Sequence, residues 1–75
     1  DYLVEVLGEQ RRMFERATRM AIDTGELRKD LDVDQFVFEL SSITGAYHHF
    51  GRLLGDPNAA KHAHRALEGL LDRAR

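Results

Sequence analysis

Residues 23–36 read DTGELRKDLDVDQF, and this stretch decides how the chain folds. Gly25 can adopt the left-handed backbone conformation that commonly ends a helix. Asp32 is a good N-cap for a following helix, with a glutamine three residues later as in a capping box. Leu31 and Phe36 occupy the two positions of a hydrophobic staple. The stretch therefore predicts a corner at which one helix ends and a second helix begins.

Apolar residues on both sides of the corner recur at helical spacing. The first helix is expected over roughly residues 2–24, and its apolar face holds Leu3, Val6, Leu7, Met13, Phe14, Ala17 and Ala21. The second helix is expected over roughly residues 33–54 and has two apolar stripes. One stripe is Phe36, Leu40, Ile43, Tyr47, Phe50 and Leu54. The other is Phe38, Ser42, Gly45, Ala46, His49 and Leu53. A helix with two contact faces usually lies between two neighbours.

A second break, Gly55-Asp56-Pro57, combines a helix-ending glycine, an N-cap and a proline suited to the first helical position. So short a loop makes the flanking helices antiparallel neighbours. The third helix is expected over roughly residues 57–74. Its apolar arc, wider than one neighbour needs, comprises Ala59, Ala60, Ala63, Ala66, Leu67, Leu70, Leu71 and Ala74. We therefore predict an all-α chain of three helices, whose last two form a hairpin that pairs with its copy as a dimeric four-helix bundle.

The composition narrows the class of protein. The chain has 75 residues, enough for one small domain or a piece of one, and it contains no cysteine. Its formal net charge of -2 is unusual for a nucleic-acid-binding module, which is typically basic. No apolar run approaches the length of a membrane span, and no signal peptide is recognisable. Because Asp1 already lies in a helical pattern, we expect a C-terminal piece of a longer protein.

The chain resembles the TetR family of transcriptional regulators, at the end of their C-terminal ligand-binding and dimerisation domain. The resemblance is carried by residues 21–32, with the "GELR…DLD" corner, and by Val33-Asp34-Gln35-Phe36 after it. The small-residue stretch near Gly45, the Gly55-Asp56-Pro57 break and the alanine- and leucine-rich last helix complete the pattern. It covers nearly the whole chain from about Phe14 onward.

The resemblance implies a homodimer in which the last two helices of each subunit form a four-helix bundle. It also implies a cavity for a small, often apolar effector, and an N-terminal helix-turn-helix for operator DNA that has no counterpart here. Residues 1–75 would then be the C-terminal part of an effector-binding and dimerisation domain of a cytoplasmic regulator, a repressor, with no cofactor, no membrane and no enzymatic activity. DNA would be a partner only through the missing N-terminal domain. The alternative is a stand-alone helical homodimerisation module without ligand or DNA.

Two sets of residues are candidates for these roles. The ligand-pocket candidates are Gln10, Met13, Phe14, Ala17, Met20, Tyr47 and Phe50. The dimer-interface candidates are Phe38, Ser42, Gly45, Ala46, His49, Leu53, Ala59, Ala63, Ala66, Leu67 and Leu70. Large apolar groups at helical spacing fit a core as well as an effector cavity. Gln10 is a polar residue within an apolar stripe, and it either meets a ligand, or bonds to a neighbouring helix, or stays exposed; the two structural interpretations are favoured over the ligand.

The histidines and hydroxyl groups give no catalytic or metal-binding pattern. No pair among His48, His49, His62 and His64 has the i,i+4 spacing of a helical zinc site, so we predict no metal ligands. Helical periodicity directs His62 toward the polar side of its helix, while His49 falls on the small-residue stripe, where it would make a dimer sensitive to pH. Serine and histidine neighbours on one helix point in different directions, so no catalytic residues are predicted.

Overall fold

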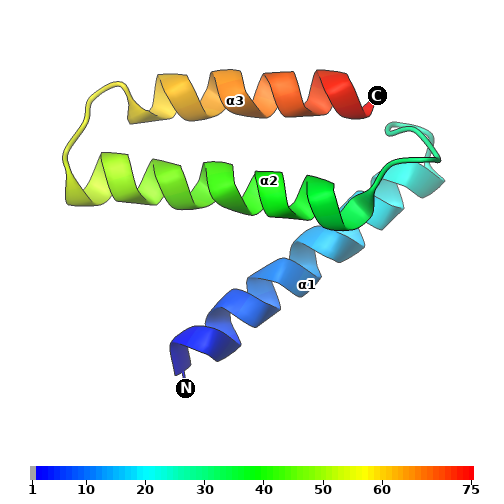
Figure 1. The fold of residues 1–75 in the computed structure, drawn as a ribbon, viewed down its shortest axis with the longest axis horizontal. Coiled ribbons are helices and arrows are strands. Elements are labelled where there is room, and N and C mark those ends of the chain that lie inside the picture. The colour runs from blue at the N-terminus through cyan, green and yellow to red at the C-terminus, as the bar shows by residue number, and fades with distance from the viewer. Residues whose placement is uncertain (1) are drawn as a thin grey trace.

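A computed structural model describes residues 2–75, and these residues form three helices and no strands (Figure 1). Helix α1 spans Tyr2–Asp23, α2 spans Val33–Tyr47, and α3 spans Ala59–Ala74. Helix α2 continues directly into a π-helical turn, η1, over His48–Leu53. The predicted all-α class, the helix order and the antiparallel hairpin of the last two helices are confirmed, while pairing with a second copy stays a prediction.

The end of α1 has the hydrogen bonds of a Schellman motif, which is why Gly25 is needed there. The Glu26 N–H donates to the Ala21 carbonyl at 2.9 Å, and the Gly25 N–H donates to the Ile22 carbonyl at 3.1 Å. Gly25 has φ of 82°, in the left-handed region that side chains disfavour. The orphan carbonyls of the helix end are thus satisfied within the corner itself.

The corner also holds the far end of α3. The Asp32 side chain caps α2 by accepting the Gln35 N–H at 3.1 Å. Between the two helices, the Arg28 backbone N–H donates to the Ala74 carbonyl at 3.0 Å, and its guanidinium donates to the Arg73 carbonyl. A cation at a helix C-terminus also complements the helix dipole. One segment therefore ends α1, begins α2 and caps α3.

The main core lies directly beneath this corner. Leu27, Phe36, Leu70 and Ala74 are buried together, so the corner, the start of α2 and the end of α3 share one apolar cluster. Residues that are partly buried surround it: Ala21, Ile22, Leu31, Leu40, Ile43 and Leu71. Leu31 joins the cluster of its staple partner Phe36, as the capping pattern predicts.

The other end of the hairpin differs in detail from the prediction. The second helix ends in the π-turn, where the Leu54 N–H donates to the His49 carbonyl, five residues back. Gly55 has φ of 66° and ends the helix as predicted. Helix α3 begins at Ala59, two residues later than predicted, with Asn58 rather than Asp56 at the N-cap position. Asp56 instead closes the loop by accepting the Asn58 N–H at 2.9 Å.

Helix α2 has three faces, where the hydropathy pattern indicates two. Figure 1 shows α1 crossing the first turns of α2, while α3 runs antiparallel along another side. Val37, which belongs to neither predicted stripe, is buried and borders a groove between α1 and α2. Ser41, Thr44 and His48 follow it at helical spacing along the same groove. The face toward α1 is therefore mostly polar in sequence.

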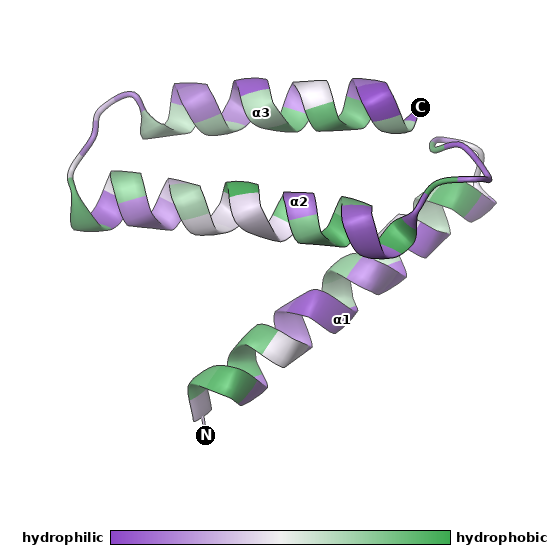
Figure 2. Cartoon of the chain, in the orientation of Figure 1, coloured by the Kyte–Doolittle hydropathy of each residue, from purple (hydrophilic) through white to green (hydrophobic). Residues whose placement is uncertain are grey.

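The molecule is open and thin for its mass. Its radius of gyration is 13.5 Å and its extents are 38 × 32 × 16 Å, whereas a compact chain of this length has a radius near 11 Å. Figure 2 shows apolar residues along the N-terminal half of α1, which leads away from the other helices. Exposed apolar residues there are Tyr2, Leu3, Val4, Val6 and Leu7. Much apolar surface is thus available for further contacts.

Replacing Gly25 with alanine should destabilise the chain by about 1–2 kcal/mol, because its positive φ disfavours any Cβ even though a Cβ here meets no atom within 4 Å. The free energy of unfolding from urea titration measures the effect. Gly8→Ala is the matched control, because Gly8 lies within α1 and its Cβ makes an ordinary contact with Arg12 at 3.5 Å. Equal effects of the two substitutions would contradict the role given to Gly25.

Candidate functional site

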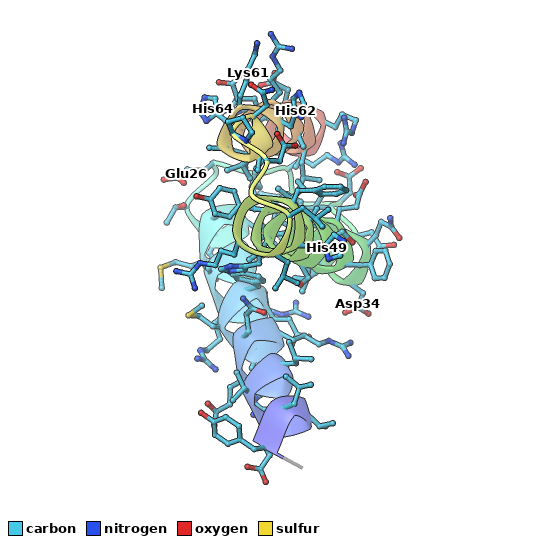
Figure 3. All side chains as sticks on the ribbon, turned by 90° about the vertical axis from the view of Figure 1, so that its left-hand side faces the viewer. Glu26, Asp34, His49, Lys61, His62 and His64 are labelled. Carbon is cyan, nitrogen blue, oxygen red and sulfur yellow. The ribbon has the colours of Figure 1, made fainter. Side chains whose placement is uncertain are left out.

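One side of α2 and of the following turn η1, between the sides toward α1 and α3, is uncovered. We call it the open face, and it consists of Phe38, Ser42, Gly45, Ala46, His49 and Leu53. All six residues are exposed, and Phe38 and Leu53 expose 68% and 76% of their surface. Figure 3, which views the hairpin from its loop end, shows His49 directed to the same side of α2 as Asp34. The six residues are the members of the predicted dimer interface that lie on α2 and η1, and the structure leaves all six exposed.

A groove of about 390 Å³ lies beside the open face, between α2 and α3. Its walls are mostly apolar and include the ligand candidates Tyr47 and Phe50 and the interface candidates Ala59, Ala63 and Ala66. His62 lines the groove instead of pointing to the polar side of α3, which corrects the prediction from helical periodicity. Ser42 and Ala46 belong to both the groove and the open face, so the two form one continuous surface.

A second groove, of about 580 Å³, separates α1 from α2. It is lined by Leu7, Gln10 and Arg11 of α1 and by the Val37 side of α2, and Phe38 and Gly45 of the open face lie at its border. Gln10 is half-buried at this groove, and no hydrogen bond ties its side chain to the neighbouring helix within residues 2–75. Its amide is free to meet a further partner.

The other ligand candidates on α1 do not join these grooves. Met13 is exposed and shares a shallow hollow with Gln10, while Phe14 is half-buried. Ala17 and Met20 are exposed, Met20 at 66%. The structure therefore separates the seven ligand candidates into a group on α1 and the pair Tyr47 and Phe50 near the hairpin loop. Whether other parts of a larger protein complete a cavity over them stays a prediction.

The interface candidates on α3 differ in their exposure. Ala66 is exposed, and Ala63 and Leu67 are half-buried. Ala59 and Leu70 are buried inside the hairpin, where the α3 residue Leu70 packs with Phe36. Ala59 and Leu70 are therefore part of the core of the hairpin, and only the other three candidates on α3 have surface left for a partner.

Polar side chains within the fold are satisfied locally. Thr18 is 3% exposed, and its hydroxyl donates to the Phe14 carbonyl at 2.7 Å. Ser42 and Thr44 likewise donate to carbonyls four residues earlier, at 2.9 and 3.0 Å. Within residues 2–75, no buried side-chain nitrogen or oxygen lacks a hydrogen-bond partner, and no group of three His, Asp or Glu residues is placed to hold a metal ion. None of the helices in this range has the length and apolar character needed to cross a bilayer.

The fold and its surfaces define an all-α domain with apolar helix faces exposed. Residues 1–67 match the family described as the tetracyclin repressor-like, C-terminal domain. This match covers most of the chain, and the chain belongs to that family of transcriptional-regulator domains. No match was found among curated proteins or among solved structures.

Proposed function

We propose that the chain is the dimerisation and effector-binding segment of a TetR-like transcriptional repressor that acts in the cytoplasm. In this proposal the open face joins two subunits, and a small apolar effector binds against α1. Operator DNA is bound by a part of the protein outside these 75 residues. The role is regulatory, with no catalytic step.

The observation that carries the proposal is the excess of exposed surface. The chain exposes 5796 Å² at a mass of 8.6 kDa, whereas a folded monomer of that mass exposes roughly 4,700 Å². The excess of about 1,100 Å² is larger than the ~800 Å² that each partner buries in a standard interface. It is also rich in exposed apolar side chains, which favours burial by a protein partner and a ligand.

The effector part of the proposal centres on α1. The Gln10 amide has no hydrogen-bond partner within residues 2–75 and lies next to apolar residues such as Leu7 and Met13. A few oriented polar groups in an apolar wall are typical of small-molecule sites. Movement of α1 relative to the hairpin on ligand binding would then pass the signal to the DNA-binding part.

Gln10→Leu should weaken binding of the amphipathic dye ANS, an aromatic sulfonate, or of a compound that displaces it, about tenfold, because one hydrogen bond to the polar group of the ligand is lost. Fluorescence titration of the full-length natural protein gives the affinity for the dye. Arg19→Leu is the control, since Arg19 is an exposed residue of α1 outside both grooves. A dimer that binds neither dye nor compound would support the stand-alone dimerisation module instead.

A further inference from the structure

The open face has a mirror-symmetric order of side chains along α2. Phe38 and Leu53 each stand seven residues from the central pair, Gly45 and Ala46, on opposite sides. Ser42 and His49 each stand three residues from the same pair. The midpoint of the face therefore lies between Gly45 and Ala46. Large apolar residues mark both ends, and the smallest residues mark the centre.

Such an order of side chains matches the symmetry of a two-fold axis. When two copies of one helix pack antiparallel, a residue before the axis lies opposite a residue equally far after it. Phe38 would lie about 11 Å from the midpoint along the helix, at 1.5 Å per residue. The π-turn brings Leu53 slightly nearer, and both residues remain exposed on the same side. The ends of the face thus match each other across the axis.

The side chains of α3 that lie beside Ala46 are also small. Ala46 shares the groove between α2 and α3 with Ala63 and Ala66, so both helices of the hairpin carry small side chains where the axis would cross. A Cβ added at Gly45 meets no atom within 4 Å of its own chain. Small residues at a crossing point allow the backbones of packed helices to approach closely.

We propose that two copies pack face to face about a two-fold axis over Gly45 and Ala46, which sets Phe38 against Leu53 of the second copy. The same register sets Ser42 opposite His49 of the second copy. This inference rests on the proposed dimerisation and adds its axis and its contacts. A second copy is the partner that fits, because the two halves of the face match each other across a two-fold axis and both ends, Phe38 and Leu53, leave large apolar side chains exposed.

Cysteine cross-linking tests the register directly, since the chain has no cysteine of its own. Phe38→Cys and Leu53→Cys are prepared separately, mixed under conditions of subunit exchange, and treated with a short bis-maleimide. We expect the mixture to give at least tenfold more cross-linked dimer than either variant alone. In the proposed register, two Phe38 positions lie about 22 Å apart along the helices, too far for the reagent.

A second pair, Ser42→Cys with His49→Cys, removes less apolar surface and repeats the test if the first pair weakens the dimer. Light scattering on the full protein, done beforehand, separates the two levels of the inference. A monomer would overturn the proposed dimerisation itself. A dimer in which each single variant cross-links as well as the mixture would leave dimerisation intact and overturn the axis.

Discussion

Replacing Gly45 with leucine should separate the proposed homodimer into folded monomers. Within one subunit the new side chain meets open space, because a Cβ at Gly45 has no neighbour within 4 Å. Across the proposed axis it would enter a close helix contact twice, once from each copy. Overpacking costs about 1–3 kcal/mol per site, so dissociation should become at least roughly thirtyfold more favourable. Sedimentation or light scattering over a concentration series gives the dissociation constant.

Two variants control for effects within the subunit. Gly45→Ala should stabilise α2 by about 0.5–1 kcal/mol, because alanine loses less backbone entropy than glycine, and it should weaken the dimer far less than leucine does. Lys61→Leu adds an apolar side chain on the opposite surface of α3, where Figure 3 shows Lys61 pointing away from α2. If Gly45→Leu stays fully dimeric at low micromolar concentration, the open face is not the interface.

Truncating Phe36 to alanine should unfold a large fraction of the molecules. Phe36 is 5% exposed and packs in the one cluster that joins the corner, α2 and α3. Such a truncation typically costs about 3–5 kcal/mol, much of the total stability of a small domain. Circular dichroism during urea titration, at fixed protein concentration because dimerisation contributes to stability, measures the loss.

Met20→Ala is the matched control for this effect. Met20 is also a large apolar residue, but it is exposed on α1, so its truncation should change the free energy of unfolding by less than about 0.5 kcal/mol. A small effect of Phe36→Ala would mean that stability comes mainly from contacts outside the described core. A large effect of Met20→Ala would instead indicate that a partner covers this part of α1.

Local signals account for the parts of the fold that were predictable. Gly25, Gly55 and Asp32 each act on the backbone within a few residues, so their roles follow from residue type and spacing. The role of Arg28 is different, because it binds carbonyls of residues 73 and 74, which are remote in the chain. The π-turn was also missed, since hydropathy does not distinguish an α-turn from a π-turn over six residues.

Helical periodicity predicts those parts of the candidate site that consist of apolar and small residues. The open face follows from helical periodicity, and all six of its residues are exposed in the structure. Hydropathy does not predict the face of α2 toward α1 as a contact face, because its serine and threonine residues are polar. Thr44 donates its hydroxyl to the Leu40 carbonyl in its own helix, so it can pack beside α1 without a partner there.

The three helices, their two breaks and their apolar faces follow from local signals, because caps, glycine conformations and periodicity act over distances of a few residues. Which of those faces are covered depends on how the helices pack against one another. Leu70 and Ala59 are buried inside the hairpin, whereas Phe38 and Leu53 are exposed. That division depends on the angle at which α1 crosses α2 and on the packing under the corner. Both are set by contacts between residues far apart in the chain.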